Sequence, residues 1–222
     1  MHFEILVEDQ SGAKALEILV PKIIGTHHTY KITDYKGIGH IPKNLKSRTD
    51  ANKRILLDQL PRLLRGYGRA FANYPYDYLT AVIFVCDLDD RCLKVFRQEL
   101  DQILDACDPK PETRFCIAVE EGEAWFLGDI QAIKAAYPKA KDSILNAYEF
   151  DSICGTWELL ANAIYPGGAK KLSEKGWVVV GAEKFTWSEK IAPLMDIDNN
   201  ESPSFRYLKA KLQELAAIKI HP

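Results

Sequence analysis

Residues 80–92 of the chain read TAVIFVCDLDDRC. An apolar run at 81–86 leads directly into the carboxylates of Asp87, Asp89 and Asp90. A short apolar run of this kind, rich in β-branched and aromatic side chains, is typical of a strand buried on both faces of a parallel sheet. Ligand sites of open α/β sheets lie at the carboxyl ends of such strands. We therefore expect Asp87 and Asp89 at a candidate ligand site.

The chemistry of these aspartates favours a cation. Carboxylates that share a sheet edge repel one another and lose solvation, which is costly unless a proton or a cation intervenes. Mg²⁺ prefers oxygen ligands of this type. The alternative is that the aspartates only turn the chain and cap the next helix, which Asp commonly does.

Two further predicted strands also end in acidic residues. Residues 3–7 form an apolar strand that ends at Glu8 and Asp9, and residues 114–119 form another that ends in EEGE at 120–123. Neighbouring strand ends adjoin in a parallel sheet. Three acidic strand ends favour a metal site over chance turn chemistry.

The remaining pattern completes an α/β fold. Residues 29–35 alternate as a second, more exposed strand, and Ser11 is a candidate N-cap for the first helix. The pattern predicts helices at 13–24, 47–72 with a break near Pro61, 91–107, 124–127, 130–136, 141–147, 156–163, 188–195 and 203–217, and a short edge strand at 177–180. We expect a mainly parallel sheet flanked by helices over residues 1–138 and a mostly helical extension over 139–222, which can pack with the core as one domain.

Bulk properties exclude several classes of protein. The 222 residues are 47% hydrophobic and 27% charged, as in an ordinary globular protein. The net charge of −2 gives no overall footprint for nucleic acid, so such binding must rest on a local patch. We expect a cytoplasmic protein without a signal peptide or membrane span. The five cysteines show no CxxC spacing, and we expect Cys86 and Cys116 to be buried thiols.

Basic residues offer candidate phosphate contacts. Lys36 and Lys43 flank a loop with Gly37 and Gly39, where backbone amides can approach a phosphate. The alternative for this loop is an ordinary surface segment. Arg91 follows the central aspartates directly. The basic face of the 47–72 helix is either a phosphate-contact surface or a solvated helix face.

The acidic motifs resemble those of the Toprim superfamily, which has a Glu after its first strand and a DxD after a later one; here these are Glu8, Asp87 and Asp89. The chain is most similar to an uncharacterised Toprim-like family, domain of unknown function 4276. The shared motifs are ILVE at 5–8, DLDDRC at 87–92, EAWFLGD at 123–129 and SPSF at 202–205. Typical Toprim domains carry Glu-Gly after the first strand, whereas this chain has Glu8-Asp9.

The resemblance implies a Mg²⁺- or Mn²⁺-dependent nuclease, or a related enzyme that transfers phosphoryl groups on nucleic acid. Asp87 and Asp89 would hold one cation with Asp90 beside them, and Glu121 or Glu123 would contribute to a second. Glu8 would act as a general acid or base, or as a ligand. Glu120 is a further ligand candidate if the helix begins there, because it then shares a face with Glu123.

The phosphate candidates Lys36, Lys43 and Arg91 would neutralise substrate charge. Two aromatic residues, Trp125 and Phe126, are expected in the core rather than on a nucleobase, and Asp129 is expected to cap the 130–136 helix.

Two other functions remain open. The resemblance also implies a non-enzymatic partner subunit of an ATPase, in defence against phage or plasmid, with a structural acidic site. The apolar Leu208, Leu212 and Leu215 would then form either an oligomer or partner interface or part of the chain's own core. A small-molecule phosphatase is least favoured, because its nucleophilic Asp follows the first strand, where this chain has Glu8.

Overall fold

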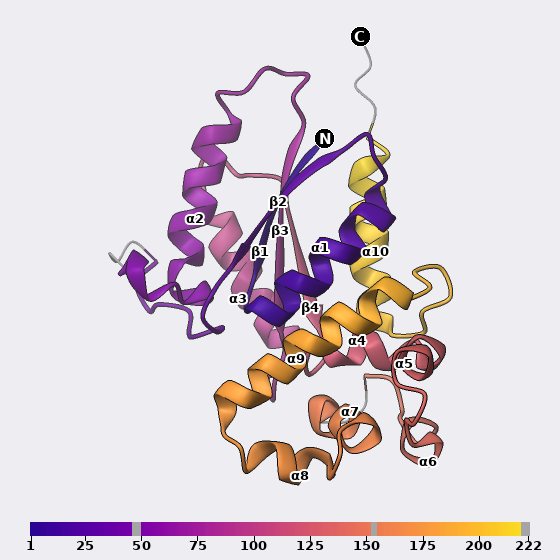
Figure 1. Ribbon diagram of the computed structural model, residues 1–222. Helices are drawn as coiled ribbons and strands as arrows, with labels where there is room; N and C mark the ends of the chain where they lie inside the picture. Colours follow the sequence, from indigo (N-terminus) through magenta and orange to yellow (C-terminus); the bar gives the residue numbers. More distant parts are fainter. Residues whose placement is uncertain (46–49, 152–154, 219–222) are drawn as a thin grey trace.

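The computed structural model describes residues 1–45, 50–151 and 155–218 (Figure 1). Its centre is a sheet of four parallel strands in the order β2-β1-β3-β4. The strands are β1 (His2–Val7), β2 (Thr29–Asp34), β3 (Thr80–Asp87) and β4 (Thr113–Ala118). The predicted α/β class and four of the five predicted strands are confirmed.

Helices cover both faces of the sheet, and their bounds follow from N- to C-terminus. They are α1 (Gln10–Ile24), α2 (Leu56–Phe71), α3 (Leu93–Asp105), α4 (Glu123–Leu127), α5 (Ile130–Ala136), α6 (Asp142–Leu145), α7 (Thr156–Ile164), α8 (Gly168–Ser173), α9 (Trp177–Ile191) and α10 (Pro203–Ala216), with 3₁₀ turns η1 (Ala51–Lys53) and η2 (Ala192–Leu194). Helices α2 and α3 lie on one face of the sheet, and α1 and α10 lie on the other (Figure 1).

The strand sequences explain this layering. Side chains alternate between the faces of a strand, so Ile83 and Val85 join the cluster beneath α1, whereas Val82 and Phe84 join the cluster beneath α2 and α3. All four are at most 4% exposed. The central strand is therefore apolar throughout because both of its faces are buried, as its continuous run predicts.

The order of the strands creates a switch point. The chain leaves β1 through α1 on one face to reach β2, then crosses through α2 on the other face to reach β3. The connections thus diverge to opposite faces between β1 and β3. In open α/β sheets the crevice outside the carboxyl ends of the strands at such a point is the usual ligand site. Glu8 follows β1 there, and Asp87 ends β3.

Helices from the C-terminal half pack against the sheet layer. Helix α9 lies along α1, and α10 lies against β4. The Lys22 ammonium of α1 donates to the carbonyls of Ala192 and Pro193, the latter at 2.7 Å, and so holds the turn η2 that directly follows α9. Both halves contribute to one hydrophobic cluster. The boundary at residue 138 stays a prediction.

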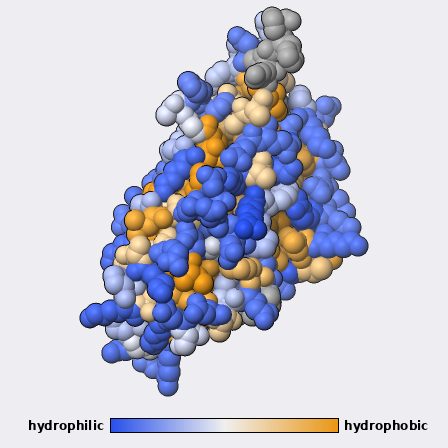
Figure 2. Space-filling view, turned by 90° about the vertical axis from the view of Figure 1, so that its right-hand side faces the viewer, coloured by the Kyte–Doolittle hydropathy of each residue, from blue (hydrophilic) through white to orange (hydrophobic). Residues whose placement is uncertain are grey.

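The leucines of α10 belong to this core. Leu208, Leu212 and Leu215 are fully buried in the same cluster as α1. Intramolecular packing therefore accounts for their apolar stripe, and they are not available as an interface. On the face shown in Figure 2, hydrophobic residues form scattered patches among hydrophilic ones. Within the described ranges, no helix is long and apolar enough to cross a bilayer.

Five local predictions are wrong. The predicted 188–195 helix is the end of the longer helix α9 followed by the 3₁₀ turn η2. Residues 177–180 begin helix α9 rather than form an edge strand, because packing of α9 on α1 overrides the β-propensity of three consecutive valines. Helix α2 runs through Pro61 without a break, since its buried leucines outweigh one lost backbone hydrogen bond. The N-cap of α1 is Asp9, which accepts from the Gly12 N–H at 2.7 Å, and not Ser11. The predicted 47–72 helix begins only at Leu56; residues 46–49 lie outside the described residues.

Candidate functional site

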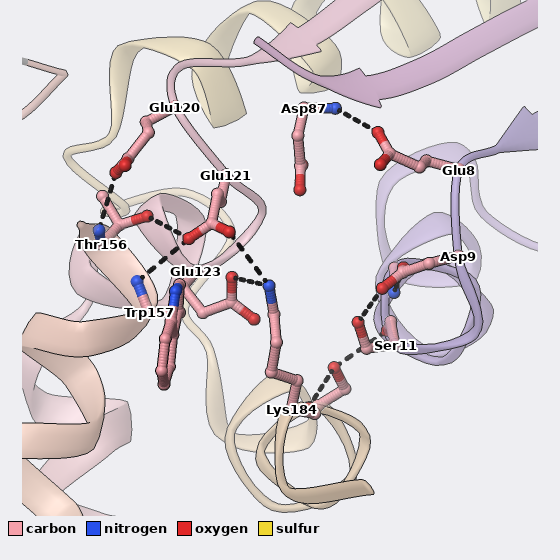
Figure 3. Close-up of polar contacts among 12 residues, drawn as sticks. Glu8, Asp9, Ser11, Asp87, Glu120, Glu121, Glu123, Thr156, Trp157 and Lys184 are labelled. Carbon is pink, nitrogen blue, oxygen red and sulfur yellow. Dashed lines mark hydrogen bonds and ion pairs between the residues drawn. The ribbon is translucent and has the colours of Figure 1, made fainter. Parts of the chain in front are cut away.

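Acidic side chains from three strand ends line one small cavity. Glu8 follows β1, Asp87 ends β3, and Glu123 opens α4 after β4. The cavity has a volume of about 30 Å³, with room for at least one guest the size of a water molecule. The Oε2 atom of Glu8 accepts a hydrogen bond from the backbone N–H of Asp87 at 3.2 Å (Figure 3). The predicted convergence of β1, β3 and β4 at one edge is therefore present for these three carboxylates.

Lys184 of α9 enters the same cavity. Its ammonium lies 3.0 Å from Glu123 Oε2 and 3.4 Å from Glu121 Oε1 (Figure 3). One turn later, the Ser188 hydroxyl hydrogen-bonds the Ser11 carbonyl at 2.9 Å, which fixes α9 against the start of α1. The lysine side chain is only 15% exposed. It is therefore a largely buried cation, paired with the buried carboxylate of Glu123 and the largely buried carboxylate of Glu121.

Sequence reasoning missed Lys184, and the sequence carried no usable signal for it. The residue lies in the middle of a helix whose first residues resemble a strand. A lone lysine at a helical position ordinarily means a solvated face. Only the packing of α9 on α1 brings it to the sheet edge.

The pKa shifts show an excess of negative charge in this cluster. Burial raises the pKa of Glu8 to about 7, reinforced by Asp89 and Asp9 and opposed by the hydrogen bond from the Asp87 N–H. Burial, and then the Glu8 carboxylate, raise the pKa of Asp87 well above its usual range.

The carboxylates beside the lysine shift in the same direction. Burial raises the pKa of Glu121 to about 7 and also raises the pKa of Glu123, although Lys184 opposes both shifts. Burial disfavours the charge on Lys184, but the surrounding carboxylates outweigh it and raise the lysine pKa. One ammonium therefore lies among four carboxyl groups. The carboxyl groups whose charge it does not balance must hold protons or attract another cation.

Glu120 and Glu121 cap the N-terminus of helix α7. Glu120 adopts a left-handed φ of 58°, and its carboxylate accepts from the backbone N–H groups of Gly155 and Thr156, the latter at 2.7 Å. Glu121 accepts from the Trp157 N–H at 3.2 Å. These are the free N–H groups at the start of α7, whose N-cap position is occupied by a glycine with no side-chain acceptor. Because α4 begins at Glu123, Glu120 does not share a helix face with Glu123.

The two aspartates of the DxD motif, Asp87 and Asp89, lie in different surroundings. Asp87 lines the cavity, whereas Asp89 does not. Asp89 has a left-handed φ of 51°, its side chain is 43% exposed, and its carboxylate lies 2.7 Å from the Arg91 guanidinium. Asp90 is exposed. Asp89 and Asp90 are thus near the site in sequence but do not line its cavity.

The three phosphate candidates lie apart from one another. Lys36 is exposed and lines a groove beside α1 and α9. Lys43 lines a separate hollow against α3, with Glu99. Arg91 is engaged by Asp89. Of the three, Lys36 is the one whose groove shares lining residues with the acidic cavity.

Several predictions around the site are confirmed. Trp125 and Phe126 are each 2% exposed and belong to the core. Asp129 caps α5 by accepting from the Ala132 N–H at 3.0 Å. Cys86 and Cys116 are buried free thiols.

The oxygen donors of the cavity are of the type that a hard cation binds, but they are not arranged as a complete set of ligands. Every donor is a carboxylate oxygen, which Mg²⁺ prefers. Across residues 1–45, 50–151 and 155–218, however, no three His, Cys, Asp or Glu side chains form a ligating group. Lys184 holds Glu121 and Glu123, and in the same part of the chain Glu8 and Asp87 form no ion pair. Glu8 and Asp87 are therefore the carboxylates left for a metal ion.

Comparison of the chain with models of known protein families, with curated proteins and with solved structures finds no match. The Toprim-like resemblance therefore rests on the motifs of this sequence alone.

Proposed function

We propose that this chain is a Mg²⁺-dependent phosphoryl-transfer enzyme that cleaves phosphodiester bonds of nucleic acid, a nuclease with a Toprim-like core. The observation that carries the proposal is the pair Glu8 and Asp87 at the switch point of a parallel sheet. Both are partly buried, and among the described residues neither forms an ion pair, because the Lys184 ammonium acts on them only at longer range and pairs with Glu121 and Glu123. A buried pair of carboxylates at a ligand-binding edge is a costly arrangement unless a cation joins it.

Each residue then has a role. Glu8 and Asp87 would hold the ion, with Mn²⁺ as a substitute, and the bound ion would neutralise charge on the transferred phosphoryl group. A Glu8 carboxyl with a pKa of about 7 is also suited to general acid or base catalysis near neutral pH. Lys184 stays protonated, so it is suited to stabilising an anionic substrate oxygen and not to acting as a nucleophile.

The first test is calorimetric titration of the chain with Mg²⁺ and Mn²⁺. The matched variants are Asp87→Asn at the cavity and Asp90→Asn at an exposed position three residues away. We expect saturable binding that Asp87→Asn abolishes and Asp90→Asn leaves intact. Binding that survives Asp87→Asn would contradict the proposed metal site.

The second test is cleavage of labelled DNA and RNA with Mg²⁺ or with EDTA. Loss of metal-dependent cleavage in Asp87→Asn, with an unchanged circular dichroism spectrum, supports the proposed activity. Equal cleavage by both proteins would mean that the activity belongs elsewhere.

One observation favours a second candidate. Glu120 and Glu121 cap α7, and Glu121 and Glu123 hold Lys184, so much of the acidic cluster has structural partners. The alternative is a non-enzymatic partner subunit of an ATPase, in a defence context, whose acidic site is structural. Absence of metal binding, together with co-elution of the chain with such an ATPase in size-exclusion chromatography, would favour it.

A further inference from the structure

A groove runs beside the acidic cavity. It has a volume of about 850 Å³ and lies between the loop after β2, the start of α1, and α9. Asp9 and Ser11 line both the groove and the acidic cavity, so the two spaces adjoin. A ligand in the groove therefore meets, at Asp9 and Ser11, the wall that separates it from the acidic cavity.

One wall of the groove is a face of α9 with a gap at its centre. Trp177, Gly181 and Phe185 recur at intervals of four residues and line the groove together. A Cβ atom placed on Gly181 would meet no other atom within 4 Å. The helix thus leaves an open space between two aromatic side chains.

Trp177 is unusually exposed for its size. Its side chain is 76% exposed, and its ring makes an edge contact with buried Trp157 at a centroid distance of 6.1 Å. That contact orients the ring while most of its surface faces solvent. An exposed, oriented indole is the kind of surface on which nucleobases stack.

The opposite wall supplies a cation. Lys36 is exposed at this wall, and within the described ranges its ammonium forms no ion pair. The neighbouring Arg54 guanidinium is already held by Asp34 at 3.0 Å. Lys36 is therefore the cation that is available to a ligand phosphate.

We infer that the groove binds single-stranded nucleic acid, with an unpaired base on Trp177 and a backbone phosphate at Lys36, and so directs the strand to the acidic site. This inference rests on the proposed function for the reaction that follows binding. A single strand is required because the bases of a duplex are already stacked on their neighbours and do not offer a free face to a side chain.

The test measures binding without catalysis. Fluorescence anisotropy of a labelled single-stranded DNA and RNA 12-mer, and of the matching duplexes, is recorded in EDTA. The variants are Trp177→Ala, which removes the stacking surface, and Gly181→Leu, which fills the groove. Their controls are Tyr76→Ala, an 85% exposed aromatic residue outside the groove, and Gly66→Leu, an exposed helical glycine of α2 with equally open space around it.

We expect Trp177→Ala and Gly181→Leu each to weaken single-strand binding by about 5-fold or more, as loss of one stacked base predicts. Gly181→Leu also replaces a helical glycine by a good helix former, so loss of binding without loss of stability identifies a steric block. Lys36→Ala should reduce the dependence of log Kd on log salt concentration by about 0.7. Both controls should bind as the unmodified chain does.

Three results would overturn the inference: no binding of single strands, binding that neither groove variant weakens, or duplex binding with the same dependence on Trp177. The inference and the proposed function fail separately. Strand binding that depends on Trp177 without any metal-dependent cleavage sustains the groove and refutes the nuclease. Cleavage that is lost in Asp87→Asn but unchanged in Trp177→Ala supports the nuclease and refutes the role of the groove.

Discussion

At the scale of single residues, Lys184 supplies the positive charge that stabilises the acidic cluster in the folded chain. Its ammonium pairs with Glu121 and Glu123 and forms no ion pair with Glu8 or Asp87, although its charge opposes the rise in pKa of both. Removing one partner from a buried ion-pair cluster costs far more than removing an exposed ion pair, because the remaining charges stay buried without compensation. The lysine is therefore the residue whose substitution reports most directly on the cluster.

We predict that Lys184→Met lowers the free energy of unfolding by about 3–5 kcal/mol in EDTA. Addition of Mg²⁺ should recover part of this loss, because a divalent cation can replace the missing charge. Urea denaturation with and without Mg²⁺ measures both effects. The control is Lys14→Met, whose ion pairs with Glu17 and Glu189 are at the surface and should cost less than about 1 kcal/mol. An equal loss of unfolding free energy in both variants would mean that the charge of Lys184 does not stabilise the acidic cluster.

The raised pKa of Glu8 makes a second prediction at this scale. Its folded pKa of about 7 exceeds the ordinary value of 4.5, so the folded chain binds more protons than the unfolded chain between these values. The contribution of Glu8 to stability therefore falls as pH rises from 4.5 through 7. We expect Glu8→Gln to be more stable than the unmodified chain at pH 8, by about 1–3 kcal/mol, and to show a shallower fall.

Urea denaturation at pH 5.5 and pH 8 measures this difference. Glu17→Gln, at an exposed position of α1, is the control and should follow the unmodified chain. A stability difference between Glu8→Gln and the unmodified chain that does not grow from pH 5.5 to pH 8 would contradict the assigned burial of Glu8.

At the scale of elements, α7 depends on a neighbouring loop for its start. Its N-cap is Gly155, which offers no side-chain acceptor, and Glu120 supplies the acceptor instead. Glu120→Ala leaves N–H groups without partners, so we expect a loss of about 1–2 kcal/mol in the free energy of unfolding. Glu120→Gln should lose less, because it keeps an acceptor and loses only the favourable charge at the helix N-terminus. Urea denaturation should rank the variants in this order; Glu99→Ala, exposed on α3, should change stability by less than about 0.5 kcal/mol. Equal effects of Glu120→Ala and Glu99→Ala would refute the capping role.

The sequence predicts elements well where local pattern and tertiary environment agree. The run at 81–86 is apolar because both faces of β3 are buried, so composition and environment give the same answer. At 177–180 they disagree: the valines favour a strand, but these residues open a helix that packs on α1. The acidic strand ends of the site could also be predicted, because each of them directly follows an apolar run that forms a strand. The turn of Asp89 toward Arg91 and the arrival of Lys184 were not, since both depend on the three-dimensional path of the chain.

At the scale of the whole molecule, the two halves of the sequence share one core. The cluster beneath α1 includes strand residues of the first half and buried residues of α9 and α10 from the second. The acidic site has the same dependence, because Glu8 and Asp87 come from the sheet whereas Lys184 comes from α9. A core and a site that both combine the two halves should lose their structure together.

The residue Phe205 tests this directly. It is fully buried on α10, and its ring lies 6.0 Å from that of Trp125 on α4, across the boundary at residue 138. We expect Phe205→Ala to lower the free energy of unfolding by about 3–5 kcal/mol, the usual cost of removing a buried aromatic side chain. Tyr76→Ala, at an 85% exposed position, is the control and should have little effect.

Two probes distinguish the halves during urea denaturation of Phe205→Ala. Three of the four tryptophans lie after residue 138, so fluorescence reports mainly on the second half. Labelling of the buried thiols Cys86 and Cys116 reports on β3 and β4 in the first half. One cooperative unit requires that both transitions move to the same lower urea concentration. A fluorescence transition that moves alone would instead mean that residues 1–138 fold independently, and that the acidic edge forms before Lys184 reaches it.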